Sequence, residues 1–290
     1  MSTTRGTIYI NLVRHALKSR EFAENLYIWG MKLIFKFLTI LDRLILKGQL
    51  RSKFFEIKQL REFRKLHKLS DFQYKVFSQN NYSEISLTKL SQKYGSDKGS
   101  SSKINPYPWQ PHTYTSYYSL LFNHQREKVA RVFECGIGSA DEAIISNMTL
   151  NGATGASLRM WRDYFPNAHI VGGDIDPKTI FQENRISTFV LDQTNPESIK
   201  GFWGQVGYAD FDLMIDDGLH SFEAGRTLFE NSIQNLSHKG IYVIEDVNVF
   251  DLLKYKEYFK NLGYLVNYIC LYSGKNEISD DCLITIEHQD

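Results

Sequence analysis

Short apolar runs alternate with helical segments in the second half of the chain, beginning near residue 130. Seven runs rich in β-branched and other apolar residues predict strands at 130–135, 169–174, 186–192, 211–216, 240–246, 264–273 and 281–287. Between them, a helical pattern predicts helices at 157–165, 177–184, 196–206, 221–236 and 251–262. Strands that alternate with helices are typical of a mostly parallel sheet with helices on both faces. The pattern therefore predicts an α/β fold.

The most apolar stretch of the chain lies outside this pattern, at residues 26–46. Four charged residues interrupt it, which is too many for a comfortable membrane span. On a helix, Lys32, Lys36, Arg43 and Lys47 share one narrow stripe. We expect either a helix packed in a subdomain or oligomer interface, with the stripe facing water, or an amphipathic helix lying on a membrane surface.

Positive charge is concentrated just after this stretch. Residues 43–68 contain nine Lys or Arg and two Glu, and 51–69 continue as a basic helical pattern. Such asymmetry can mark contact with an anionic surface. The polar run 72–86 is typical of a linker. We therefore predict a helical N-terminal region at 1–85, used for oligomerisation or for acceptor or membrane-surface contact, and an enzyme domain at 86–290.

Composition limits the class of protein. Hydrophobic residues make up 42% and charged residues 23%, as in ordinary globular proteins, and the net charge of +1 argues against a nucleic-acid partner. The three cysteines are odd in number and widely spaced, so they indicate neither a disulfide framework nor a zinc site, which fits a reducing cytoplasm. The first ten residues lack the basic start and apolar core of a secretory signal. We expect a cytoplasmic protein.

Acidic residues follow the predicted strands. Four strands end in or just before Glu134, Asp174, Asp192 and Asp216. Strand packing does not require carboxylates there, and carboxylates gathered along one sheet edge repel one another unless something neutralises them. Open α/β sheets bind ligands at the carboxyl ends of their strands. This edge is therefore the predicted site.

A glycine turn follows the first of these strands. Gly136 and Gly138 allow a sharp turn and a close approach to a ligand, which suits S-adenosylmethionine or a nicotinamide cofactor, although a plain tight turn needs the same residues. A dinucleotide fingerprint requires a third glycine three residues on, where this chain has Asp141. That difference favours S-adenosylmethionine.

The next two strand ends carry groups that suit a nucleoside. Asp174 ends its strand as a ribose-binding acid would, and Asp192 and Gln193 are candidates for adenine. The ribose acid is common to both cofactor classes and does not choose between them.

Carboxylates also follow the fourth and fifth strands of the pattern. We expect Asp217, Glu245 and Asp246 to converge, because these strands should be neighbours, and no cationic partner lies nearby in the sequence. A bare cluster of three carboxylates is costly. A hard divalent cation removes that cost, and oxygen-only ligands suit Mg²⁺ or Ca²⁺.

His220 follows Asp217 by three residues, and Gly218 permits a turn between them. A neutral imidazole beside a metal is a candidate general base, because its pKa lies near working pH. A histidine after a strand can instead be a packing or helix-capping residue, and paired acids often cap helices.

Seven segments together resemble a known family. They are YGSDKG (94–99), HTYTSYY (112–118), VFECGIG (132–138), GASLRMWRDYFPNAHIVGGDID (155–176), LDQ (191–193), IDDGLHS (215–221) and GIYVIED (240–246). This pattern resembles the metal-dependent sugar O-methyltransferases typified by the mycinamicin 2''-O-methyltransferase. The resemblance covers roughly residues 88–250.

The resemblance implies a Rossmann-like class I methyltransferase fold with a seven-stranded sheet, and S-adenosylmethionine and Mg²⁺ as cofactors. Its implied site residues are the following: His220 and Asp217 in catalysis; Asp217, Glu245 and Asp246 on the metal; and Glu134, Gly136, Gly138, Ser157, Asp174, Asp192, Gln193 and Asp216 on the cofactor. An insert at 139–154 displaces the helix after the glycine turn, and we expect Ser157 to cap that helix near the methionine carboxylate. Tyr94, Lys98, His112 and Tyr114 belong to a lid, to subunit contacts or to the core.

The resulting prediction is a magnesium-dependent O-methyltransferase for a small-molecule sugar acceptor. The acceptor classes are a nucleotide sugar, a capsule or lipopolysaccharide sugar of polysaccharide biosynthesis, and a glycosylated natural product. We also expect a homo-oligomer, and contact of the N-terminal helices with the inner membrane as the second expectation for that region. The alternatives are a nicotinamide-dependent oxidoreductase and a non-catalytic methyltransferase-fold assembly subunit.

Overall fold

The computed structural model describes residues 75–78, 86–99, 107, 109, 111–150, 152–272 and 282–289. All of them belong to the compact unit that runs from Gln59 to Asp290. The predictions for the apolar stretch at 26–46 and for the basic segment at 43–68 lie outside the described residues, and the domain boundary near residue 85 stays a prediction.

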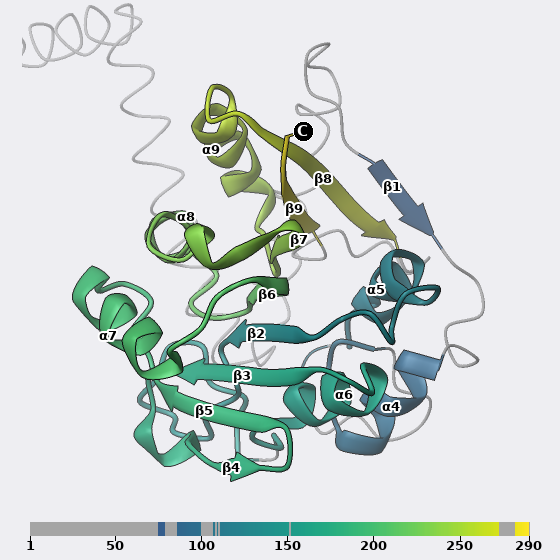
Figure 1. Cartoon of the computed structure of the whole chain (residues 1–290), viewed down its shortest axis with the longest axis vertical. Helices are drawn as coiled ribbons and strands as arrows, with labels where there is room; N and C mark the ends of the chain where they lie inside the picture. Colours follow the sequence, from purple (N-terminus) through teal and green to yellow (C-terminus); the bar gives the residue numbers. More distant parts are fainter. Residues whose placement is uncertain are drawn as a thin grey trace, which may run out of the picture. The chain divides into compact units, whose positions relative to one another are not determined.

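One mixed sheet is the centre of the described part (Figure 1). Within the described residues it has nine strands in the order β1-β8-β9-β7-β6-β2-β3-β5-β4. The strands are β1 (Lys75–Ser78), β2 (Arg131–Cys135), β3 (His169–Asp174), β4 (Gln182–Glu183), β5 (Ile186–Val190), β6 (Phe211–Asp216), β7 (Leu236–Ile244), β8 (Tyr264–Tyr272) and β9 (Cys282–His288). All seven predicted strands are confirmed.

Most neighbouring strands run parallel. Strands β1 and β8, β2 and β3, β2 and β6, β3 and β5, and β6 and β7 pair in parallel, whereas β9 is antiparallel to β7 and β8, and β4 is antiparallel to β5. The predicted α/β class with a mostly parallel sheet is therefore confirmed. The sheet exceeds the implied seven strands by two short ones, β1 and β4.

Both additional strands lie where the sequence predicted a different structure. Strand β1 lies in the run expected to be a linker. The helix predicted at 177–184 is wrong: the chain forms a 3₁₀ turn at Pro177–Thr179 and then β4. The hydroxyl of Thr188 on β5 bonds both the N–H and the carbonyl of Phe181, each at 2.6 Å. These bonds hold the segment against the edge of the sheet, so it does not form the predicted helix.

Helices cover both faces of the sheet (Figure 1). One face packs against α4 (Ser86–Tyr94), α5 (Tyr114–Phe122) and α6 (Ala156–Tyr164), and the other against α7 (Pro196–Val206), α8 (Phe222–Glu230) and α9 (Val249–Phe259). The helix predicted at 221–236 ends at Glu230, because β7 begins at Leu236. Within the part of the chain that the structure describes, every helix is too short or too polar to cross a bilayer.

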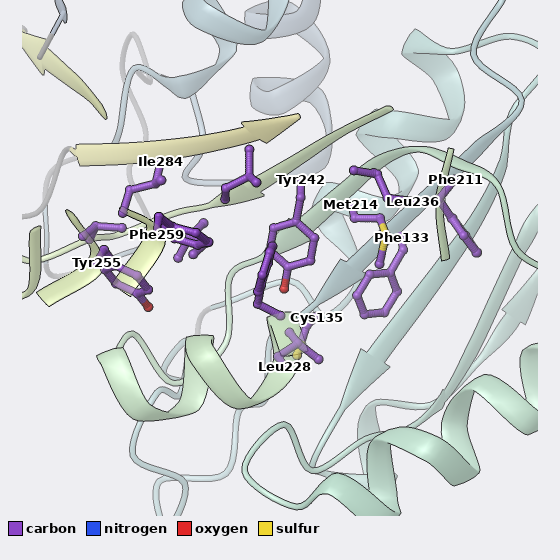
Figure 2. Packing of buried hydrophobic residues seen from close by; sticks show 14 of the residues in the cluster. Phe133, Cys135, Phe211, Met214, Leu228, Leu236, Tyr242, Tyr255, Phe259 and Ile284 are labelled. Atoms are coloured by element: carbon purple, nitrogen blue, oxygen red, sulfur yellow. The ribbon is translucent and has the colours of Figure 1, made fainter. Parts of the chain in front are cut away.

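Alternation along the strands divides the core into two clusters. On β2, Val132 packs toward α4, α5 and α6, whereas Phe133 packs toward α7, α8 and α9. Figure 2 shows part of the second cluster, in which Leu228 of α8 and Tyr255 of α9 meet strand residues such as Tyr242. The same alternation decides on which side of the sheet each carboxylate at the strand ends must lie.

Candidate active site

Three carboxylates project from neighbouring strands on the face covered by α5 and α6. Glu134 stands on β2, Asp217 follows β6 and Glu245 follows β7, and each is two residues beyond a residue of the core cluster on that face. Trp161 Nε1 donates to Glu134 Oε2 at 2.9 Å, and the Tyr118 hydroxyl donates to Glu245 Oε1 at 2.7 Å. We call Glu134, Asp217 and Glu245 the inner group.

A buried lysine occupies the middle of the inner group. Lys98 follows α4, and its side chain is 2% exposed. Its Nζ lies 2.5 Å from Asp217 Oδ2 and 3.1 Å from Glu134 Oε1, and it also contacts Glu245 Oε2. Burial alone would lower the pKa of Lys98, but the three carboxylates outweigh burial and hold it well above its usual range. Lys98 therefore keeps its positive charge at neutral pH, and it is the partner that sequence reasoning did not find.

Asp217 also belongs to a second group of titratable side chains, which lies on its other side. His220 Nε2 lies 3.4 Å from Asp217 Oδ1 and 3.4 Å from Asp246 Oδ2. We call Asp217, His220 and Asp246 the outer group. Asp246 also accepts a hydrogen bond from the Tyr114 hydroxyl and lies 3.5 Å from His112 Nε2. Asp217 belongs to both groups, one oxygen to each.

The backbone is strained at two residues of the outer group. His220 has φ +53° and Asp246 has φ +50°, in the left-handed region that only glycine enters at no cost. Such strain, of order 1–3 kcal/mol for each residue, persists where the surrounding structure enforces it and is concentrated at functional sites. At Asp246 it lets a residue next to Glu245 join the outer group on the same side of the sheet.

Electrostatics in the outer group favour positive charge. Burial alone would lower the pKa of His220, but Asp246 and Asp217 outweigh burial and raise it to about 10. Without another cation, the imidazole is therefore held in its protonated form. Burial raises the pKa of Asp246, although His112 and His220 oppose that shift.

The outer group lies on the wall of a cavity of about 630 Å³. Of the predicted site residues, the following line this cavity: Gly136, Gly138, Ser157, Asp174, Asp192, Gln193, Asp217, His220 and Asp246. Glu134, Asp216 and Glu245 are not among the lining residues and are buried behind the wall. The structure thus brings most of the predicted site together, with three acids one layer deeper.

The glycine turn forms another part of this wall. Gly136 has φ +86°, and a Cβ there would collide with the backbone carbonyl of Asp217. Gly138 has φ +91°, and a Cβ there would collide with Met148 of the insert. Residues 143–148 of the insert line the cavity as well. The insert is therefore one side of the cavity, and α6 begins only after it, at Ala156.

Asp174, Asp192 and Gln193 reach the cavity with part of their hydrogen-bonding capacity in use. Asp174 accepts from the N–H groups of Ile137 and Asp176, both at 2.9 Å. Asp192 accepts from the N–H and the hydroxyl of Thr194. Each carboxylate keeps lone pairs for a ligand.

Gln193 and Asp216 join two strand ends. The Gln193 amide donates to Asp216 Oδ1 at 3.1 Å and accepts from Leu219 N–H at 2.7 Å. Burial raises the pKa of Asp216 to about 6, against His220 and the hydrogen bond from Gln193. Both side chains therefore fix the loop that carries Asp217 and His220, and a direct role of either on a cofactor stays a prediction.

The predicted cap at Ser157 is wrong. The N-cap of α6 is Gly155, with φ +70° and no side-chain cap, so Ser157 lies inside the first turn. Its hydroxyl interacts with Glu134 while the residue lines the cavity.

The metal prediction can be tested against the donor atoms. Among the described residues, Asp217, His220 and Asp246 offer ligand atoms within 4.8 Å of one another, and so do Glu134, Asp217 and Glu245. The predicted set of Asp217, Glu245 and Asp246 is divided between these two groups. The outer group offers carboxylate oxygens at the cavity wall and an excess of negative charge, which fits a hard divalent cation. Glu245 as a metal ligand stays a prediction, because its two oxygens face Tyr118 and Lys98.

Sequence reasoning placed Lys98, His112 and Tyr114 in a lid, in subunit contacts or in the core, and it did not consider Tyr118. All four contact the two carboxylate groups. The available signal was the pair of segments 94–99 and 112–118, which are rich in polar and aromatic residues but lie outside the strand–helix pattern. Neither α4 nor α5 was predicted.

Sequence comparison finds relatives among enzymes that methylate sugars. The chain is 34% identical over 161 residues to 8-demethyl-8-alpha-L-rhamnosyl tetracenomycin-C 2'-O-methyltransferase of Streptomyces olivaceus, covering 56% of this chain and 37% of that one. It is 35% identical over 136 residues to mycinamicin VI 2''-O-methyltransferase of Micromonospora griseorubida, and this match covers 47% of this chain and 32% of that one. The chain thus spans about a third of the length of these curated relatives. No family model matches the sequence.

Comparison with solved structures finds the MycE methyltransferase from the mycinamycin biosynthetic pathway in complex with Mg and SAH. The identity is 30%, the TM-score is 0.45, and the match covers 61% of this chain and 39% of that one. The sequence matches confirm the resemblance that the motifs predicted: this chain is a homologue of the sugar O-methyltransferases of macrolide and other polyketide pathways.

Proposed function

We propose that this protein is an S-adenosylmethionine-dependent O-methyltransferase that acts on a sugar hydroxyl and uses a divalent cation, Mg²⁺ in the first instance. The observation that carries the proposal is the outer group, a histidine between two carboxylates, on the wall of the cavity that the glycine turn also lines. A cavity of about 630 Å³ is of the size that small-molecule sites have. Homology to sugar O-methyltransferases supports the choice of reaction.

The residues of the chain have distinct parts in this proposal. Asp217 and Asp246 would hold the cation, and the glycine turn would admit the cofactor to the cavity. When bound, S-adenosylmethionine supplies the methyl group and the cation supplies positive charge that lowers the pKa of the acceptor hydroxyl and of His220. His220 Nε2 then accepts the hydroxyl proton. Residues 143–148 of the insert line one side of the cavity and would shield it from water there.

The acceptor is proposed as a class. Nucleotide sugars, capsule or lipopolysaccharide sugars and glycosylated natural products all offer a hydroxyl beside a second oxygen, which suits a cation held by two carboxylates. The relatives carry names of glycosylated natural-product substrates, which favours that class as the first to test. A homo-oligomer, a cytoplasmic location and peripheral membrane contact through residues 1–85 complete the proposal and rest on the sequence.

The nicotinamide alternative lacks a structural basis. A dinucleotide site needs a helix directly after the glycine turn to receive the pyrophosphate. Here the insert follows Gly138, and Asp141 forms an ion pair with Lys178 at 2.9 Å.

Calorimetric titration tests the proposed cofactor and metal. We expect micromolar binding of S-adenosylmethionine, and binding of one glycosylated acceptor that requires Mg²⁺ and is lost in EDTA. A protein that binds no S-adenosylmethionine under any condition would contradict the proposal. Full turnover in EDTA would contradict its metal part.

His220→Ala tests catalysis itself. We expect methyl transfer to slow by about two to four orders of magnitude, since general-base catalysis typically contributes that much, with little change in S-adenosylhomocysteine affinity. His238→Ala, at an exposed position of β7, is the matched control and should keep the wild-type rate. An assembly subunit would lose nothing in either variant.

A further inference from the structure

Two of the three cysteines of the chain lie against each other in the core. Cys270 on β8 and Cys282 on β9 are directly opposite residues of an antiparallel pair. The Cys282 thiol donates to Cys270 Sγ at 3.3 Å, and neither residue is in a disulfide. Cys135, the third cysteine, lies elsewhere, on β2, with its Sγ 3.9 Å from Gln193 Oε1. The proposed reaction uses none of these thiols.

The backbone around the pair already has the geometry that a disulfide needs. Opposite residues of antiparallel strands have Cα atoms roughly 4.5–5.5 Å apart, and disulfides join Cα atoms roughly 4.4–6.8 Å apart. Both side chains lie on the same face of the sheet, in the core cluster that also contains residues of α8 and α9. The sulfur atoms must approach from 3.3 Å to roughly 2.05 Å. Side-chain rotation is enough for that, so the strands can stay in place.

The place of the pair in the sheet gives a small oxidant access to it. Both thiols are buried, at 3% exposure for Cys270 and 1% for Cys282. However, Cys282 is the first residue of β9, and Cys270 lies two residues before the end of β8. The ends of strands open locally at a much lower free energy than the middle of a sheet. A small neutral oxidant such as hydrogen peroxide can therefore reach the sulfur atoms without global unfolding.

The pair is also connected to the segment that carries Asp246. The carbonyl oxygen of Cys282 accepts a hydrogen bond from Val247 N–H at 2.9 Å, and Val247 directly follows Asp246. The preceding residue is held from a different strand, because Glu245 N–H donates to the carbonyl of Asp216 at 2.9 Å. A covalent bond at Cys282 should therefore stiffen the chain after Asp246 and leave the contact of Glu245 unchanged.

We propose that Cys270 and Cys282 form a redox-sensitive pair, which a peroxide converts to a cross-strand disulfide that stiffens the segment after Asp246. One thiol attacks the peroxide and becomes a sulfenic acid, with release of one water molecule. The second thiol attacks that sulfur, which forms the S–S bond and releases another water molecule. Excess low-molecular-weight thiol reverses the reaction by exchange, so the bond is transient in a reducing compartment. Only the relevance of Asp246 rests on the proposed function.

Counting the thiols of the full-length chain tests the pairing. The native protein is treated with dilute hydrogen peroxide in EDTA, and after removal of the peroxide it is denatured and titrated for reactive thiols. We expect the three thiols of the wild type to fall to one and to return to three after reduction with dithiothreitol. Cys135→Ser is the matched control and should fall from two thiols to none. Cys270→Ser should form no intramolecular disulfide when its peptides are analysed by mass spectrometry.

Stability and amide hydrogen exchange test what the bond does. We expect the oxidised wild type to melt on the order of 5–10 °C higher than the reduced protein, because the disulfide closes a short loop. Exchange at Val247 should slow by on the order of tenfold, since its acceptor is the carbonyl of Cys282, whereas exchange at Glu245 should not change. Cys270→Ser should show neither effect after the same treatment.

The outcomes separate the two parts of the proposal. A wild type that keeps all of its thiols in peroxide, or that forms disulfides only between molecules, would overturn the pairing. A disulfide that forms without slower exchange at Val247 would overturn the connection to the segment after Asp246. None of these readouts involves S-adenosylmethionine, a metal or an acceptor. A protein that proved to bind no S-adenosylmethionine would therefore refute the proposed function and leave the results on the cysteine pair unaffected.

Discussion

Two buried tyrosines allow the contribution of the inner group to the free energy of unfolding to be measured. Tyr118 on α5 and Tyr242 on β7 are both 0% exposed. The Tyr118 hydroxyl donates to Glu245 Oε1 at 2.7 Å, whereas the Tyr242 hydroxyl has no hydrogen-bond partner among the residues that the structure describes. Replacing either tyrosine with phenylalanine removes one oxygen and keeps the ring. The same chemical change should therefore have opposite consequences.

The magnitude follows from the partner of each hydroxyl. Tyr118→Phe removes a hydrogen bond to a buried carboxylate and leaves Glu245 with Lys98 as its remaining contact in the inner group, which should cost about 2 kcal/mol of unfolding free energy. For a domain of this size, that corresponds to a melting temperature lower by about 4–8 °C. Tyr242→Phe removes a buried polar group that nothing satisfies, so we expect a change between zero and a gain of about 1 kcal/mol.

Urea and thermal unfolding in EDTA, followed by tryptophan fluorescence, measure both variants. The midpoint should move in opposite directions, or fall only for Tyr118→Phe, with an unchanged dependence on urea concentration. Edge-to-face contacts with Trp161 for Tyr118 and with Phe229 for Tyr242 remain in both variants and serve as the internal control. Equal losses in the two variants would refute the reasoning, because burial rather than the carboxylate partner would then decide the cost.

The strands were predictable because buried strands of a parallel sheet are nearly continuous apolar runs. Helix α7 was predicted with its observed bounds, since clear signals limit it: the Asn195 side chain caps it, Pro196 begins it, and Gly207 ends it with φ +74°. By contrast, α5 has the sequence YTSYYSLLF and is buried along most of its length. It shows no alternation between apolar and polar faces, so no helical period marks it.

The carboxylates of the site could be predicted for a local reason and Lys98 could not. Acidic residues at strand ends share one sheet edge whenever the strands are parallel neighbours. Lys98 lies 119 residues before Asp217 and 147 before Glu245, and it reaches them only because α4 packs beside α6. A long-range ion pair of this kind leaves no pattern in a single sequence. The division of the acids between two groups depends in turn on this lysine and on the left-handed backbone of Asp246.

Three further predictions concern Asp163, the glycine turn and α7. Burial alone would raise the pKa of Asp163, but hydrogen bonds from three neighbouring side chains outweigh it and lower the pKa to about 2. Because this value is below that of the unfolded chain, the stabilisation exists above about pH 4 and disappears as the pH falls toward 2. Asp163→Asn should therefore cost about 1–2 kcal/mol at neutral pH and only a few tenths of a kcal/mol near pH 2, as measured by urea unfolding across pH. Gly136→Ala should cost about 1–3 kcal/mol and abolish S-adenosylhomocysteine binding, because φ is +86° and the new Cβ meets the carbonyl of Asp217. Gly201→Ala, in the middle of α7 with open space around it, should instead stabilise by about 0.5–1 kcal/mol; a Gly136→Ala protein that binds the ligand normally would show that the turn does not approach it.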